Sequence, residues 1–178
     1  MEALIITQDD ISAQYPLSKN LNDDRINPYI LRAQQADLKP ILGTYFYYEF
    51  IEGFTELPTP EVRWVELFEG VVYEWQTGQP EYFNGIKPML IAFAYARIVD
   101  NNSNHVTRGG NVTKSTDESL PVVSAVKNAM NMDAESDAYR YKADLLRFLD
   151  KKRTVYPEYG RSPIQGDGWK TGFNFTKV

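Results

Sequence analysis

The segment from residue 21 to residue 51 repeats apolar residues at helical spacing and predicts two helices joined at Pro40. Asn22 is suited to cap the first helix, because its side chain can accept a hydrogen bond from a backbone N–H that has no partner inside the helix. The apolar face runs straight through Pro28, which favours one kinked helix from Asn22. The alternative is a fresh helix start at Asn27 with Pro28 as its first residue.

The spacing of apolar residues predicts two shorter helices after the first one. The second helix of the pair should begin at Pro40 and end near residue 52 or 53, because proline disfavours helical geometry in the residue before it and glycine commonly ends a helix. The Thr-Pro-Glu sequence at 59–61 is typical of a further helix start, and Gly70 is its natural end. The apolar positions predicted for this short helix are Val62, Val65, Leu67 and Phe68.

Residues 71–83 are rich in β-branched and aromatic side chains and have Gly78 between their two halves, which predicts a β-hairpin. Pro80 suits a strand at the edge of a sheet, because it cannot donate a backbone hydrogen bond. An isolated hairpin is only marginally stable in water. This hairpin should therefore pack against the side of a helical body.

A helix that begins at Asn84 or Gly85 contains a stretch, Met89 to Ala96, that is apolar on every face. Such a pattern is typical of a helix surrounded by protein, so we expect this to be the core helix. Arg97 interrupts the apolar run. It should be held in a buried structural ion pair or extend its charge to the surface.

Polar residues dominate positions 101–121, where Gly109 and Gly110 suit a turn and predict a second hairpin or an extended flap near residues 104–116. The longest helix should follow Ser119 and extend over about 30 residues, or roughly 45 Å. Its apolar positions are spaced four apart almost throughout: Val122, Val126, Met130, Ala134, Ala138, Tyr141, Leu145 and Leu149.

Helical periodicity ends after Arg153. The remaining residues, 154–178, mix proline and glycine with the aromatic residues Tyr156, Tyr159, Trp169, Phe173 and Phe175. Disordered tails are typically poor in aromatic residues, so this segment is predicted to be an arm that wraps over a partner surface. The alternative is that it folds back over its own domain.

Together these elements predict a mainly α protein, a bundle of about four to five helices with one or two small β-hairpins and an extended C-terminal arm. At 178 residues the chain is long enough for one well-buried core, so we expect residues 1–153 to form a single domain. No stretch approaches the roughly 20 apolar residues that a membrane span needs. The first residues lack the pattern of a secretory signal, and the absence of cysteine excludes disulfides and thiolate metal sites.

Charge is distributed unevenly along the chain. Residues 1–150 hold 13 basic and 22 acidic side chains, whereas residues 151–178 hold six basic and two acidic ones. An acidic body argues against non-specific nucleic-acid binding, which depends on the neutralisation of phosphates. The basic tail is suited to contact DNA or an acidic protein, although an ordinary solvated tail fits its composition equally well.

Candidate catalytic chemistry is sparse. His105 stands in the polar segment of a chain without cysteine, and no serine has a nucleophile-elbow context, so neither Ser-His-Asp nor Cys-His catalysis is supported. Adjacent carboxylates such as Asp9 with Asp10 fit helix starts or turns better than a metal site, and no glycine-rich phosphate-binding motif occurs. We therefore expect no catalytic, cofactor-binding or metal-binding residues, and we do not expect an enzyme.

Three motifs occur in order along the chain: LNDDRINPYILRAQQADLKPILG, then GIKPMLIAFAYARIVDNNSNHVTRGGNVTK, then DLLRFLDKKRTVYPEYG. In this order they resemble the head-tail connector (adaptor or ring) proteins of tailed bacteriophages, especially crAss-like and related phages of Bacteroidetes hosts. The resemblance covers residues 7–160.

The resemblance implies a structural virion protein that is assembled in the host cytoplasm and lies at the head-tail junction. It implies a ring of the chain itself, commonly of twelve copies, that contacts the portal protein on one side and the next tail or ring protein on the other. DNA would pass through the lumen without sequence-specific binding. The family has no catalytic residues to carry over and no membrane contact.

Candidate residues of a subunit or partner interface come from polar positions of the first helix, from the flap and from the aromatic residues of the arm: Arg25, Arg32, His105, Arg108, Tyr156, Tyr159, Trp169, Phe173 and Phe175. Gln35 and Lys39 extend this set along the first helix pair. Two other functions remain open. One is a head-closure or tail-completion protein, which would bind a tail component rather than portal, and the other is an acidic regulator that binds a host protein through the basic aromatic tail.

Overall fold

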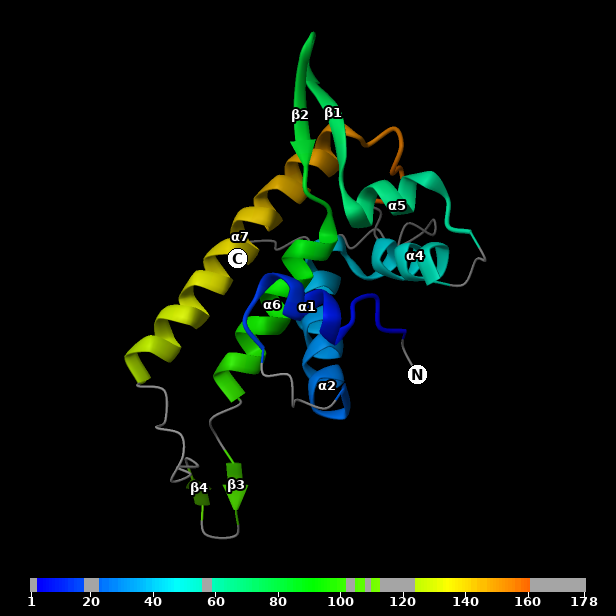
Figure 1. Cartoon of the computed structure of the whole chain (residues 1–178). Helices are drawn as coiled ribbons and strands as arrows, with labels where there is room; N and C mark the ends of the chain where they lie inside the picture. Colours follow the sequence, from blue (N-terminus) through cyan, green and yellow to red (C-terminus); the bar gives the residue numbers. More distant parts are fainter. Residues whose placement is uncertain are drawn as a thin grey trace, which may run out of the picture.

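The computed structural model describes residues 3–17, 23–55, 59–101, 105–107, 110–112 and 124–160 (Figure 1). Its elements in chain order are α1 (Gln8–Gln14), α2 (Asp23–Ala33), the π-helical turn η1 (Gln34–Leu38), α3 (Lys39–Leu42), α4 (Thr44–Thr55), α5 (Val62–Glu69), β1 (Val71–Gln76), β2 (Gln79–Phe83), α6 (Ile86–Asn101), β3 (His105–Thr107), β4 (Gly110–Val112) and α7 (Ser124–Lys151). The predicted mainly α class with small antiparallel hairpins is confirmed. Among the helices described, none is long and apolar enough to cross a membrane.

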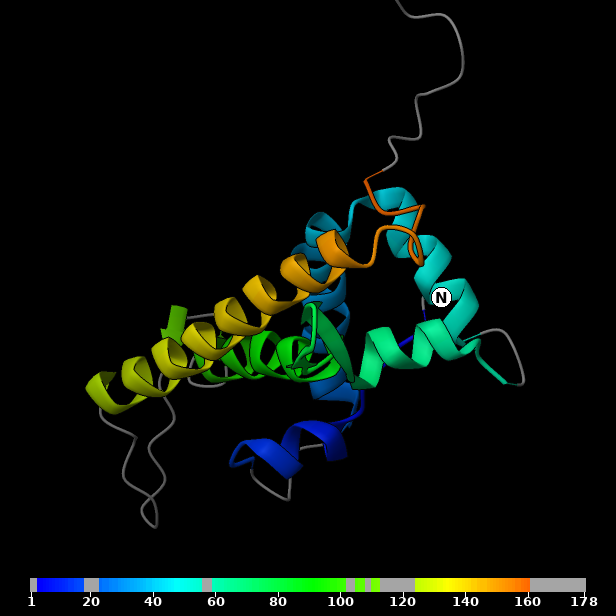
Figure 2. The same cartoon turned by 90° about the horizontal axis from the view of Figure 1, so that it is seen from above.

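Helix α6 is the centre of the structure. Every residue from Met89 to Ala96 is buried, which confirms the predicted core helix. Helices α1, α2, α5 and α7 all pack against it, and α7 lies along most of its length (Figures 1 and 2). A helix that is apolar on every face can bury that surface only if neighbours cover it all round. The arrangement of the other helices follows from this requirement.

Helix α2 runs without interruption through Pro28, so the continuous helix is correct and the alternative start at Asn27 is wrong. The predicted break at Pro40 is also wrong, because Lys39 keeps helical dihedral angles and the chain stays helical to Leu42. The π turn explains why. The Lys39 N–H donates to the carbonyl of Gln34, five residues earlier, and this wider turn relieves the clash that proline makes in an α-helix.

The bend between the two helices lies at Gly43, three residues after the predicted position. Its φ of 81° is in the left-handed region that glycine adopts without strain, and α4 begins at the next residue. Helix α4 then continues to Thr55, two or three residues beyond the predicted end at 52 or 53.

The π turn also holds the N-terminal segment. Gln34 is fully buried, and its side-chain carbonyl accepts a hydrogen bond from the Ile5 N–H at 3.0 Å. Its side-chain amide donates to the Ala3 carbonyl, also at 3.0 Å. These two bonds attach the chain before α1 to the helix pair, and α1 starts directly afterwards with a capping box between Thr7 and Asp10.

Helix α5 ends at Gly70 as predicted, but it begins at Val62 with Glu61, not Thr59, at its N-cap. The buried side chains are Trp64, Leu67 and Phe68. Val62 and Val65 are 73% and 39% exposed, so these two predicted apolar positions are wrong. Trp64 sets the buried face instead, because it packs on the aromatic rings of α4.

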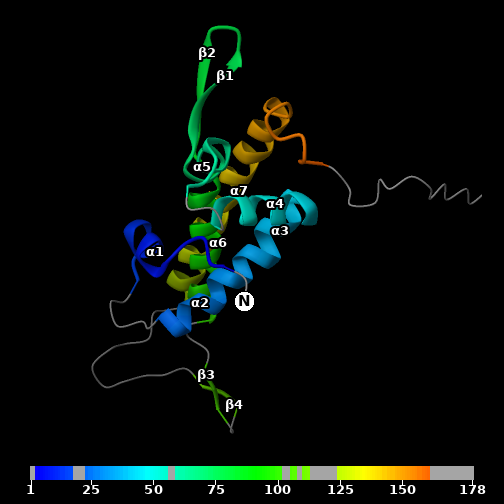
Figure 3. The same ribbon diagram turned by 90° about the vertical axis from the view of Figure 1, so that its right-hand side faces the viewer.

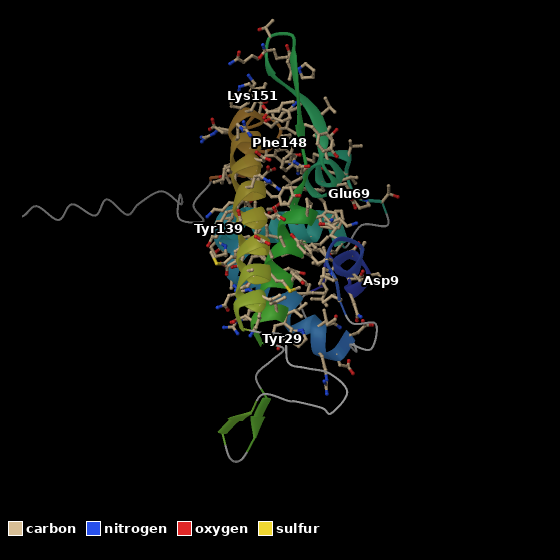
Figure 4. All side chains as sticks on the ribbon, turned by 60° about the vertical axis from the view of Figure 1, so that its left-hand side comes forward. Asp9, Tyr29, Glu69, Tyr139, Phe148 and Lys151 are labelled. Atoms are coloured by element: carbon tan, nitrogen blue, oxygen red, sulfur yellow. The ribbon has the colours of Figure 1, made fainter. Side chains whose placement is uncertain are left out.

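Strands β1 and β2 form the predicted hairpin, with Gly78 in the turn and Pro80 opposite Glu74. The side of the hairpin that faces the body carries Tyr73 and Phe83, which both contact Phe148 of α7 (Figure 4). The Phe83 and Phe148 rings stack with 4.1 Å between centroids. The hairpin packs on the helical body at its base and projects from one end of it (Figure 3).

Helix α7 confirms the predicted long helix, with 28 residues. Ala134, Ala138, Leu145 and Leu149 are buried as predicted, but Val126 is 52% exposed. Val122 lies outside the described residues. Strands β3 and β4 pair within the predicted flap, so a second hairpin is present there.

The turns after α7 pack on the chain's own helices. Tyr156 is 1% exposed, and its hydroxyl donates to the Arg63 carbonyl at 2.7 Å. Tyr159 packs edge-on against Phe46 of α4. Residues 154–160 therefore fold back over their own domain, which was the alternative, and their assignment to an extended arm is wrong, as is the assignment of Tyr156 to a partner interface. Trp169, Phe173 and Phe175 lie outside the described residues.

Replacing Tyr156 tests this packing. Tyr156→Ala should lower the free energy of unfolding by about 3–5 kcal/mol, because it leaves a cavity between α4, α5 and α7. Tyr156→Phe, which removes only the hydrogen bond to Arg63, should cost about 1 kcal/mol. Urea denaturation measures both, with the half-exposed Tyr82→Phe as the control. An unchanged stability of Tyr156→Ala would show that this residue does not anchor the C-terminal turns.

The capping box of α1 makes stability depend on pH. Burial raises the pKa of Asp10, but hydrogen bonds from Thr7 and the ion pair with Lys87 outweigh it and hold this pKa below its ordinary value of 3.8. The stabilisation is therefore complete above the unfolded-state pKa and is lost as the pH falls through the lower folded-state pKa. The stability difference between wild type and Asp10→Asn should be greatest near neutral pH and shrink below about pH 4. Denaturation curves across this range give the measurement, and a constant difference would contradict it.

Candidate interaction surfaces

A groove of about 360 Å³ opens between α2–η1 and α7, and α6 forms its floor. We call it the η1–α7 groove. Its first wall carries Arg32 and Asp37, its floor Phe93 and Ala96, and its second wall Asn131, Glu135 and Tyr139. A shallower hollow of about 210 Å³ continues it towards Pro40 and Ile41 of α3. The groove exists because α2–η1 and α7 pack on different sides of α6.

The lining of the groove is mainly polar and its charges balance. The Tyr139 ring stands edge-on to the Phe93 ring, with 5.9 Å between centroids, and remains 58% exposed. The charged side chains of the groove and the hollow are three cations, Arg32, Arg97 and Lys142, and three carboxylates, Asp37, Asp100 and Glu135. The groove therefore suits an uncharged or evenly charged occupant better than a strongly charged one.

One ion pair stiffens the floor of the groove. The Arg97 guanidinium donates to both carboxylate oxygens of Asp37, at 2.9 and 2.8 Å. Their side chains are 26% and 16% exposed. The structural ion pair predicted for Arg97 is therefore confirmed. It also ties α6 to the π turn, because Asp37 lies in η1.

Asn131 presents an unused acceptor at this groove. Its side-chain Oδ1 is buried and has no hydrogen-bond partner among the described residues. A buried acceptor without a donor costs roughly 1–3 kcal/mol.

The outward side of the β1–β2 hairpin forms a second surface. Val72 and Tyr82 are opposite each other in the strand register and are 62% and 59% exposed. Glu74 and Pro80, the next pair on this side, are also exposed. We call these four residues the hairpin outer face. Tyr73 and Phe83 point into the body, and among the described residues none covers the outer face.

The sequence-predicted interface residues have different surroundings. Arg25 and Arg32 are both exposed and lie seven residues apart, on the same side of α2, and Arg32 reaches the rim of the η1–α7 groove. Gln35 is exposed, whereas the ammonium of Lys39 donates to the Tyr48 hydroxyl at 2.9 Å. The structure therefore brings one predicted residue, Arg32, to the groove.

The remaining predicted residues do not join this surface. His105 lies in β3, in the second hairpin, and Figure 3 shows the two hairpins at opposite ends of the molecule. Arg108 lies outside the described residues. Tyr159 is partly buried against the core. Among the described residues, no group of three His, Cys, Asp or Glu side chains could hold a metal ion.

Two parts of these surfaces were not predicted from the sequence: the second wall of the groove, with Asn131, Glu135 and Tyr139, and the hairpin outer face. A signal for part of this surface was present. Met132 and Tyr139 are large apolar residues seven positions apart on the otherwise polar side of α7, and they are 68% and 58% exposed. Two such residues on one exposed helical stripe indicate a contact surface.

Most of these surfaces lie within a segment that matches a known protein family. DUF6712, a family of unknown function, matches residues 38–167. The chain belongs to this family. The DUF6712 match includes the floor of the groove, its α7 wall and the β1–β2 hairpin, whereas α1 and α2 precede it. No curated protein and no solved structure matches the chain.

Breaking the ion pair at the floor tests its structural role. Arg97→Met leaves the half-buried Asp37 carboxylate without its main partner and should lower the free energy of unfolding by about 1–3 kcal/mol. The matched control is Arg140→Met, because Arg140 is 68% exposed in its pair with Asp137 and should contribute less than about 0.5 kcal/mol. Equal effects in urea denaturation would contradict a special role for the Arg97 pair.

Proposed function

We propose that this protein is a structural subunit of a phage virion, and that copies of it form a ring between the portal of the head and the tail through which DNA passes. Twelve copies are the number implied by the connector proteins that the sequence resembles. On this proposal the chain acts through surfaces rather than through a catalytic site.

The observation that carries the proposal is the pair of unlike contact surfaces. The η1–α7 groove is concave, and the hairpin outer face stands on a projecting element at one end of the molecule (Figure 3). A contact between unlike surfaces repeats from copy to copy and generates a ring when the rotation closes.

The resembling motifs supply a second line of support. The first motif, residues 21–43, covers α2, η1 and α3, and the second, residues 85–114, covers α6 and the β3–β4 hairpin. These two motifs contribute one wall and the floor of the groove. The segments that resemble connector proteins therefore coincide with a surface suited to assembly.

The charge of the body agrees with passage of DNA. Residues 1–150 carry 22 acidic and 13 basic side chains. Negatively charged walls do not hold phosphate groups, so DNA would slide through such a ring instead of adhering to it. Mapping of the lumen in an assembled particle tests this step, and a lumen lined mainly by lysine and arginine would contradict it.

Reconstitution with partner proteins tests the function directly. The purified chain is mixed with the portal protein of its own phage and, separately, with a tail component, and the products are examined by native mass spectrometry and negative-stain imaging. Rings bound to portal are the expected result. Binding to the tail component alone would favour a head-closure or tail-completion protein, and no association with itself or with portal would refute the proposal.

Arg32 provides a variant that separates folding from assembly. Arg32→Glu leaves four carboxylates facing two cations in the groove and its hollow, so it should weaken self-association about tenfold or more. The exposed position should keep the free energy of unfolding within about 0.5 kcal/mol of wild type. The control is Asp9→Lys on α1, an equally large charge change on the opposite side of the molecule from Tyr139 (Figure 4). Ring yield on portal is the measurement, and equal loss in both variants would contradict the role of Arg32.

A further inference from the structure

We propose that the outward side of α7 pairs with the same side of α7 in a second copy of this chain, with the two helices antiparallel. Such a contact is two-fold symmetric, so it joins two copies and then closes. The inference goes beyond the proposed ring, in which each copy contacts its neighbours through unlike surfaces.

The outward side of α7 has the layout of a coiled-coil seam. Its residues recur at alternating spacings of three and four between positions 129 and 146, which are the spacings of the two seam positions of a heptad. We call these residues the α7 seam: Ala129, Met132, Ser136, Tyr139, Ala143 and Leu146. All of them are exposed except Leu146, which is partly buried. Ala134, Ala138 and Leu145, on the opposite side of the helix, are fully buried.

The seam is open in the folded chain. Met132 and Tyr139 are 68% and 58% exposed, so no described residue covers them. Helix α7 forms one edge of the molecule (Figure 1). Large apolar side chains that repeat at heptad spacing on an exposed helix indicate a partner helix.

The sizes of the seam residues select the antiparallel orientation. One heptad position holds only small residues and the other only large ones: Ala129, Ser136 and Ala143, against Met132, Tyr139 and Leu146. In an antiparallel pair the two positions face each other, so every large side chain meets a small one and the surfaces interdigitate. The layers are Ala129 with Leu146, Met132 with Ala143, and Ser136 with Tyr139. In a parallel pair each position faces itself, so large residues would meet large ones.

The charges beside the seam favour the same orientation. Glu135 and Lys142 lie on one flank, and Asp133 and Arg140 lie on the other. In an antiparallel pair each flank faces its own copy, so each carboxylate lies opposite a cation and four attractive pairs form. A parallel pair in register would instead place Lys142 opposite Arg147. Flanking charges of this kind set the orientation of paired helices.

The contact should be weak. The seam is about 27 Å long, and two helices that touch over this length bury less than the roughly 800 Å² per partner of a standard interface. Arg140 also pairs with Asp137 of its own chain, at 2.8 Å and largely in solvent. We therefore expect a dissociation constant in the range of about 10–100 μM.

The dimer is a form of the free chain. Glu135 and Tyr139 belong to the α7 contact and also line the η1–α7 groove. Pairing through α7 covers that wall of the groove, so a copy cannot use both contacts at once. Copies that enter the proposed ring through the groove must first separate at α7.

Charge reversal tests the contact in the free chain, without portal. Glu135→Lys and Lys142→Glu each turn two attractive pairs into repulsive ones, so each should weaken the dimer about tenfold or more. An equimolar mixture of the two variants restores opposite charges and should dimerise as well as wild type. Sedimentation equilibrium gives the dissociation constants. The control is Asp9→Lys, on the opposite side of the molecule from Tyr139 (Figure 4).

Disulfide crosslinking tests the orientation, because the chain has no cysteine of its own. A mixture of Met132→Cys and Ala143→Cys should crosslink under mild oxidation, because an antiparallel pair places these two positions in one layer. Met132→Cys alone should not, because its two copies would be about 16 Å apart along the helices and a disulfide needs Cα atoms within about 7 Å.

The outcomes separate this inference from the proposed function. A free chain that stays monomeric at about 500 μM, or a mixture of the charge variants that does not recover dimerisation, would overturn the pairing. Crosslinking of Met132→Cys alone, together with a tighter dimer of Lys142→Glu, would show a parallel pair and also overturn it. Loss of portal binding by Glu135→Lys in a monomeric chain would assign the seam to portal instead. The dimer measurements need no portal, so the proposed ring is tested separately by reconstitution.

Discussion

The burial of α6 is the constraint on which the rest of the structure depends. Its central stretch, Met89 to Ala96, has no polar face, so helices must cover it on all sides before any of it is stable in water. Two of its covering elements, α2–η1 and α7, approach it from different directions and leave the η1–α7 groove between them. The groove is thus a by-product of the way in which the core helix is covered, and its floor is part of the core.

Much of this fold could be predicted from local patterns. The α6 stretch, the β1–β2 hairpin and the end of α5 at Gly70 each depend on a few neighbouring residues. The continuation through Pro40 could not be predicted, because it depends on a π turn that tertiary packing stabilises through Gln34 and the N-terminal segment. Tyr156 is buried by rings from α4, α5 and α7, and its hydroxyl bonds to a residue 93 positions earlier. No local pattern encodes a contact at that separation.

The candidate surfaces likewise contain residues that the local sequence predicts and residues that only the folded chain brings together. Arg32 was predicted as an exposed residue of the first helix pair, and it lies at the groove. The groove itself combines residues from three distant segments, so it has no motif in the sequence. Asn131 illustrates the difficulty, because an asparagine on a long amphipathic helix is ordinary until the structure shows that its Oδ1 is buried and has no donor among the described residues. Chemistry of this kind arises from assembly of the fold rather than from residue type.

The base of the β1–β2 hairpin has a mechanical consequence. A Cβ atom at Gly70 would lie only 2.3 Å from the Phe83 carbonyl oxygen, so the two strands meet there with no room for a side chain. The same end of the hairpin is stacked on α7 through Phe148. The hairpin is therefore held rigidly at its base and does not pivot there as a hinged loop would. A force applied at its tip would be transmitted as torque to α7 and, through it, to α6, the most deeply packed helix of the molecule.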